Sequence, residues 1–199
     1  MSDHPIIFSG AMILALMAAA QRRAGGKTQT RRLATSPLAN AKPGDRLWTR
    51  ETAWYEPADV KPADAKSVIW SVTCGNLPPN ILEGKKQAPS IHMPRWASRL
   101  TLIVKEVRLE PVQAISEEDA WAEGVCHAIE RSRPGLSMGN LGQDMRRSIV
   151  TGYIGGAREA FHWLWDQLHH KEGDRWEDNP QIAALTFDAV EDNITRLAA

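Results

Sequence analysis

The sequence predicts an α+β fold, a small β-barrel with flanking helices and long loop insertions. Three observations favour this class: the strand-like apolar segments are short, few segments have a helical period, and long Pro- and Gly-rich stretches separate them. A chain of 199 residues can bury one core of ordinary size, so we expect a single domain over residues 1–199.

A strand and a buried helix are expected near the amino terminus. The apolar run at residues 5–9 predicts the strand, and Ser9 can cap a helix over about residues 10–24. The apolar run at residues 11–20 would span only about 15 Å as a helix, half the thickness of a bilayer's hydrocarbon core. Positive charge follows this run and does not precede it, which disfavours a secretory signal. We therefore expect a cytoplasmic protein without a membrane-spanning segment.

Three more strands are expected in the middle of the chain. The segment at 46–54 follows a Pro-Gly-Asp turn, the segment at 67–73 is rich in β-branched residues, and the segment at 100–112 has the clearest strand pattern. Residues 55–66 and 75–99 contain many prolines, and we expect them to be loops.

A short helix, a loop, a longer helix and a last strand should complete the chain. Ser116 can cap the short helix, with Asp119 as the acidic member of a capping box. The stretch at 131–156 is rich in Gly and Ser, and we expect a loop-rich insertion. Residues 157–170 have an amphipathic helical pattern, and residues 181–190 alternate as a strand.

Four segments, taken together and in order, form a specific pattern. They are GGKTQTRR at 25–32, PGDRLWTRETAW at 43–54, ISEEDAWAEGV at 115–125 and IAALTFDAV at 182–190. This pattern resembles the ASCH family, whose small β-barrel fold is related to PUA domains. The stretch IHMPRWASRLTL at 91–102 is further similar to the larger, phage-associated branch of that family. Compact members lack most of residues 55–98 and 127–157, which the resemblance therefore identifies as insertions.

The resemblance also implies a function. The characterised enzymes of the family are amidohydrolases that remove the acyl group from N4-acetylcytidine and related N4-acylated cytosines, giving cytidine and a carboxylic acid. Their lysine, threonine and glutamate fall on Lys27, Thr30 and Glu123 of this sequence. Gly26 stands where the compact enzymes carry arginine. Other members are thought to bind RNA or to cleave it, so an RNA-binding module and a ribonuclease are the alternatives.

Amide hydrolysis needs a nucleophile, a proton acceptor and a group that holds the oxyanion. Thr30 would be the nucleophile. Lys27 can be the base only if its pKa, ordinarily about 10.4, falls by about 2–3 pH units, and Glu123 would then protonate the leaving amine. Alternatively, Glu123 is the base and the Lys27 ammonium holds the oxyanion. The crowding of cations at 27–32 slightly favours the first assignment. Neither assignment needs a metal or another cofactor, and the scattered histidines suggest no ligand set.

Five residues are candidates for binding the substrate. Stacking on an aromatic ring is worth about 1–3 kcal/mol per base, and Trp48 and Arg50 would share one face of a strand at 46–54. That face could instead belong to the core, with Arg50 and Glu51 as an ion pair at its rim. Arg31 belongs to the basic segment, which on its own pattern also fits a solvated charge run. Trp96 either covers the site as part of a lid or packs its loop onto the barrel.

Charge and cysteine content exclude some classes of protein. The 24 Lys and Arg residues balance the 24 Asp and Glu residues, which argues against a protein that coats nucleic acid non-specifically. The two cysteines, Cys74 and Cys126, are too few for a disulfide scaffold or a four-thiolate zinc site. The expected partner is a modified nucleoside or nucleobase, with RNA as the alternative, and no pattern indicates an oligomeric state.

Overall fold

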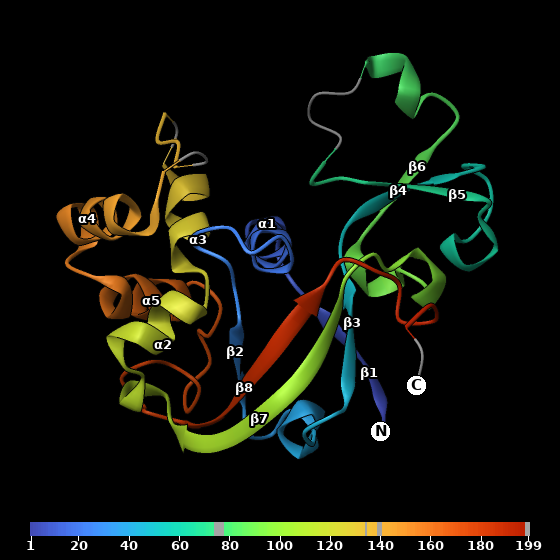
Figure 1. The fold of residues 1–199 in the computed structure, drawn as a ribbon. Helices are drawn as coiled ribbons and strands as arrows, with labels where there is room; N and C mark the ends of the chain where they lie inside the picture. The colour runs from blue at the N-terminus through green and yellow to red at the C-terminus, as the bar shows by residue number, and fades with distance from the viewer. Residues whose placement is uncertain (74–77, 134, 139–140, 198–199) are drawn as a thin grey trace.

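The computed structural model describes residues 1–73, 78–133, 135–138 and 141–197, which form two β-sheets and five α-helices (Figure 1). The strands are β1 (Asp3–Ile7), β2 (Gln29–Leu33), β3 (Arg46–Arg50), β4 (Ala53–Glu56), β5 (Ser67–Trp70), β6 (Lys86–Ala88), β7 (Thr101–Pro111) and β8 (Gln181–Val190). The helices are α1 (Gly10–Ala20), α2 (Glu117–Ala122), α3 (Val125–Ser132), α4 (Gln143–Ile154) and α5 (Ala157–Asp166). The predicted α+β class is confirmed. Cys74 lies outside the described residues, and Cys126 is a buried free thiol.

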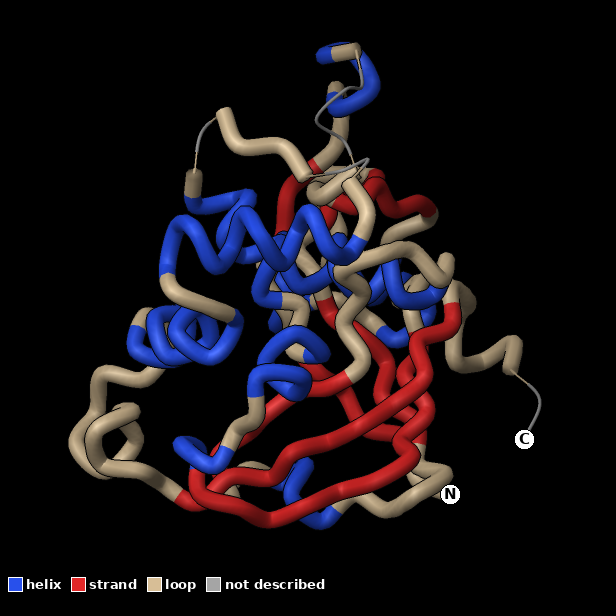
Figure 2. Tube along the Cα trace, turned by 60° about the vertical axis from the view of Figure 1, so that its left-hand side comes forward, coloured by secondary structure: helices blue, strands red, loops and turns tan. Residues whose placement is uncertain are grey.

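The central sheet has the strand order β1-β3-β7-β8-β2. Only β1 and β3 are parallel, and the long strands β7 and β8 form its middle and curve along their length (Figures 1 and 2). The edge strands β1 and β2 do not pair with each other in the described chain, so a closed barrel is not confirmed. A side chain connects them instead: Arg32 Nη2 donates to the Ile7 carbonyl at 2.9 Å.

The expected single strand at 46–54 is wrong, because the chain changes sheets within it. β3 ends at Arg50, and β4 joins a separate sheet of order β5-β4-β6. Between the two strands, the backbone N–H of Glu51 donates to Met93 Sδ at 3.2 Å and its carboxylate binds Arg99, so this residue leaves the ladder. Trp48 and Trp54 therefore belong to different sheets.

The expected loop at 131–156 is also wrong, because it contains the end of α3 and the whole of α4. α4 packs against α3 and α5, and Val150 is fully buried in the cluster that these helices share. The Gly- and Ser-rich composition of the stretch hid the sparse apolar spacing of α4. Tertiary packing stabilises this helix more than its own propensities predict.

The two insertions lie on opposite sides of the central sheet. In Figure 1, helices α2–α5 lie to the left, the small sheet lies to the upper right, and α1 lies between them. Each region has its own apolar cluster, and a third cluster joins α1 to the central sheet. That the whole chain is one domain remains a prediction.

The helix α1 is shorter than expected and ends at Ala20. The segment after it returns along the helix, and Lys27 N donates to the Ala15 carbonyl at 2.9 Å. Gly26 makes this return possible, because a Cβ there would lie 2.6 Å from the Ala19 Cα. No side chain fits at Gly26, the position where the resemblance expected an arginine in compact enzymes. Of the helices in the described ranges, none has the length and apolarity needed to cross a bilayer.

We expect Gly26→Ala to lower the free energy of unfolding by about 1–3 kcal/mol, because the added methyl group would push the loop away from α1. Gly152→Ala, at an exposed position in the last turn of α4, is the matched control: its Cβ would meet nothing within 4 Å. That control should raise the stability by about 0.5–1 kcal/mol through helix propensity. Urea unfolding of both variants measures the difference, and equal stabilities would contradict the close approach.

Candidate active site

The structure brings Lys27 and Glu123 into direct contact. Lys27 lies in the loop between α1 and β2, and Glu123 ends α2, 96 positions further along the chain. Lys27 Nζ is 2.6 Å from Glu123 Oε2 and donates to the Glu123 carbonyl at 2.8 Å. The two residues are only 1% and 4% exposed. Both are positions that the resemblance assigned to catalysis.

Arg31 occupies the other oxygen of the same carboxylate. Its Nη1 donates to Glu123 Oε1 at 3.1 Å, while its Nη2 contacts Glu110 at 2.8 Å and Asp119 at 3.0 Å. Gln29 accepts from Arg31 and donates to Asp119, which closes the network. Arg31 was predicted to bind substrate, but in the structure its terminal nitrogens bond protein groups. Its place is that of a residue that orients Glu123.

Burial and neighbouring charges determine the protonation of this network. Burial lowers the pKa of Lys27; Glu123 opposes that effect, and the nearby cations Arg31 and Arg32 add to it. Burial alone would raise the pKa of Asp119, but the bond from Gln29 and the charge of Arg31 outweigh it, and that pKa is lowered. A neutral Lys27 amine is therefore more accessible here than on a protein surface.

Thr30 is close in sequence, but the network does not include its side chain. It lies on β2 opposite Leu185 and is 2% exposed. In the described chain no hydrogen bond joins its hydroxyl to Lys27 or Glu123. Because side chains alternate along a strand, Thr30 shares a face with Arg32, whereas Arg31 points to the other face.

A cleft of about 640 Å³ lies beside the network, between β1, β2, β3 and the end of α5. Phe8 and Arg32 are among its lining residues. Lys27 Nζ is 5.7 Å from the centroid of the Phe8 ring, and Arg32 Cζ is 5.3 Å from the same centroid. Lys27 is therefore close to this cleft, although it is not itself a lining residue. Phe8 and Arg32 were not predicted as site residues, because one belonged to a strand pattern and the other to a charge run.

Trp48, Arg50 and Glu51, which were predicted to bind the substrate together, do not all lie together in the structure. Arg50 lines the cleft, and its Cζ lies 5.4 Å from the centroid of the Trp48 ring, as the shared strand face predicts. Glu51 is buried and forms its ion pair with Arg99 at 2.8 Å, so the expected pairing of Arg50 with Glu51 is wrong. Burial raises the pKa of Glu51, and Arg99 opposes that effect.

Trp96 packs on the unit formed by the small sheet. Its ring lies edge-on to Tyr55 with centroids 6.5 Å apart, and its Nε1 donates to the Ala63 carbonyl at 3.4 Å. These contacts favour the alternative in which Trp96 holds its loop in place. A role for Trp96 in binding the acyl group remains a prediction.

The described residues show no group of three or more His, Cys, Asp or Glu side chains that could hold a metal ion. Two of the three histidines near the end of α5 stack on tryptophans: His162 on Trp176, and His169 on Trp165 with ring centroids 3.8 Å apart.

No family model and no curated protein matches the sequence. Among solved structures, a crystal structure of an Enterococcus faecalis V583 protein, described under the family DUF984, aligns with 100% of this chain and 86% of its own length. The TM-score is 0.41 and the sequence identity is 10%. A likeness of this degree assigns neither a family nor an activity.

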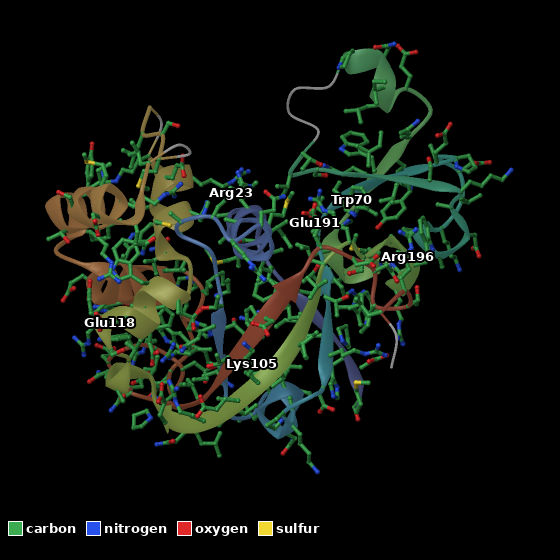
Figure 3. All side chains as sticks on the ribbon, in the orientation of Figure 1. Arg23, Trp70, Lys105, Glu118, Glu191 and Arg196 are labelled. Atoms are coloured by element: carbon green, nitrogen blue, oxygen red, sulfur yellow. The ribbon has the colours of Figure 1, made fainter. Side chains whose placement is uncertain are left out.

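We expect Glu123→Gln to lower the free energy of unfolding by about 3–5 kcal/mol, because it leaves two buried cations without their shared counter-charge. The control is Glu118→Gln, the same substitution at an exposed position of α2 (Figure 3), which should cost about 0.5 kcal/mol or less. Denaturant unfolding gives both values. Similar losses for the two variants would contradict the buried network.

The lowered pKa of Lys27 predicts a pH dependence of stability. Between that lowered pKa and the ordinary value of 10.5, the unfolded chain binds more protons than the folded protein, so the contribution of Lys27 to stability rises with pH. Lys27→Met lacks this contribution. The stability of the wild type relative to Lys27→Met should therefore increase between pH 7.5 and about pH 10, as urea unfolding can measure. A constant or falling difference would contradict the shift.

Proposed function

We propose that the chain is a metal-independent amidohydrolase that removes acyl groups from N4-acylated cytosine nucleosides, on a PUA-like fold of the ASCH type. One observation carries the proposal: Lys27 and Glu123, the two residues that the resemblance pairs, form a buried contact of 2.6 Å from positions far apart in the chain. A buried lysine with a lowered pKa beside a carboxylate is the kind of pair that acid–base catalysis uses.

The contacts favour Lys27 as the base. Both oxygens of Glu123 already accept a hydrogen bond from a cation, so its lone pairs are poorly placed to take a proton from a substrate. Lys27 Nζ donates to the carboxylate and to the carbonyl of Glu123, and it lies 5.7 Å from the centroid of the Phe8 ring. Glu123 would take up and return the proton of the Lys27 ammonium.

In the proposed reaction, Lys27 accepts the hydroxyl proton of Thr30 while Thr30 Oγ1 bonds to the acyl carbon. The resulting oxyanion collapses as the bond from carbon to N4 breaks, and the proton that Lys27 took from Thr30 passes through Glu123 to the leaving N4. Water then hydrolyses the acyl ester of Thr30 and releases the carboxylic acid. The Thr30 hydroxyl must turn toward Lys27 for the first step.

The cleft is the proposed site of the cytosine ring. Phe8 offers an aromatic surface in its lining, and Lys27 Nζ lies 5.7 Å from the centroid of that ring. An RNA-binding module would use the same cleft without turnover, and a ribonuclease would release a phosphate ester. A hydrolysis assay therefore separates the three.

We expect the wild-type protein to convert N4-acetylcytidine to cytidine, followed by ultraviolet absorbance. Lys27→Met and Glu123→Gln should each lower kcat by about 10²–10⁴-fold, because each removes an acid–base partner. Glu118→Gln should keep the wild-type rate. Circular dichroism establishes that each variant is folded. Full activity in folded Lys27→Met would eliminate the mechanism, and no turnover by the wild type would reject the function.

A further inference from the structure

The charges that line the cleft are all of one kind. Arg32 and Arg50 line it together with mostly apolar side chains, and no Asp or Glu is among its lining residues. His169 also lines it, but burial lowers the pKa of that imidazole, although the carbonyl of Trp165 opposes the effect. At neutral pH the two arginines therefore carry the positive charge of the cleft.

Neither arginine is in ion-pair contact with a carboxylate of the described residues, although the charge of Glu123 raises the pKa of Arg32 and so opposes the lowering by burial. Arg32 donates to the carbonyls of Ile7 and Arg31, and Arg50 donates to the carbonyl of Ile91. In the described ranges, no ion pair involves either guanidinium, whereas Arg31 and Arg99 are both paired with carboxylates. The Nε of Arg50 is buried without any partner there. A half-buried guanidinium that lacks a counter-ion is stabilised by an anionic ligand.

Arg32 and Arg50 both line this cleft and flank the end of β1. Ile7, the last residue of β1, is the register partner of Arg50 on β3, and its carbonyl accepts from Arg32 on β2. Phe8 follows directly, and its N–H donates to the Arg50 carbonyl at 3.3 Å. One arginine thus approaches the end of β1 from each side. The amino end of α1, whose cap residue Ser9 also lines the cleft, adds a smaller positive potential at the same place.

We propose that the substrate carries a phosphate group, and that Arg32 and Arg50 bind this phosphate as a pair, so that the preferred substrate is an N4-acylated cytidine 5′-monophosphate. This inference rests on the proposed function and names the substrate class of the same site. Arg32 Cζ and Lys27 Nζ lie 5.3 and 5.7 Å from the centroid of the same Phe8 ring, so one nucleotide can reach from the arginine toward the lysine.

A single nucleotide fits the cleft better than an RNA strand does. A volume of about 640 Å³ is in the range of sites for one small molecule. A strand of several nucleotides would need a longer basic track, and the chain has no excess of cations overall. The apolar lining, which includes Met12 and Leu38, also favours a ligand with a flat ring over a bare inorganic anion.

Calorimetric titration with the product pair, cytidine and cytidine 5′-monophosphate, tests the phosphate site without any need for turnover. The wild type should bind the monophosphate about 10–100-fold more tightly than cytidine, as expected for charge-assisted bonds to two arginines. Arg50→Gln should reduce this ratio by about tenfold or more. The control, Arg196→Gln, removes the same charge from an exposed position (Figure 3) and should leave the ratio unchanged. Equal affinities for the two ligands, or equal effects of the two variants, would overturn the inference.

A second measurement separates this inference from the proposed function. The kcat/KM values of N4-acetylcytidine and its 5′-monophosphate are compared on the wild type, and the monophosphate should be preferred by a similar factor. Equal hydrolysis of both would overturn the phosphate site and leave the function supported. An Arg50-dependent preference for the monophosphate in binding, without hydrolysis of either, would support the phosphate site and reject the function. Much tighter, steeply salt-dependent binding of a cytidine oligonucleotide would overturn the mononucleotide in favour of RNA.

Discussion

The buried carboxylate of Glu123 is the constraint on which the site depends. One carboxylate serves two cations that burial would otherwise destabilise, Lys27 on one oxygen and Arg31 on the other. Because the three residues come from the α1–β2 loop, β2 and the end of α2, the contact fixes these segments relative to one another. Removing Glu123 takes the shared counter-charge from two buried cations, which is why the geometry is specific although such a pair adds little net stability.

The two faces of β2 differ in how their charged side chains are paired. Arg31 and Gln29 face α2 and the acidic side chains there, where every charge has a partner. Arg32 faces the cleft, where its partners are carbonyl groups. Because side chains alternate along a strand, Arg31, which pairs with carboxylates and orients Glu123, is followed directly by Arg32, which has no such ion pair in the described ranges. Arg31 holds the carboxylate of Glu123 and lowers the pKa of Lys27, whereas Arg32 remains available to a ligand.

The parts of the fold with strong local patterns could be predicted from the sequence. β8 has the bounds that were expected, and Ser116 accepts from Asp119 N at 3.0 Å as the cap of α2. The split of the strand at 46–54 could not be predicted, because it depends on Arg99, which is distant in sequence. α4 was missed because packing, not propensity, stabilises it. For the site, the composition of the basic segment at 27–32 fitted a solvated charge run. Only the resemblance to a known family selected Lys27 and Glu123 together.

The open edge of the central sheet explains where the site lies. A strand edge leaves backbone N–H and C=O groups unpaired, and a closed barrel would pair those of β1 with those of β2. Here a guanidinium replaces that ladder, since Arg32 satisfies the carbonyl of Ile7 from the opposite strand. A side chain spans a wider gap than a backbone ladder does, so the two edges can stay apart and the cleft lies between them. The group that joins the two edges, Arg32, is therefore also one of the two cations that we propose bind the phosphate of the substrate.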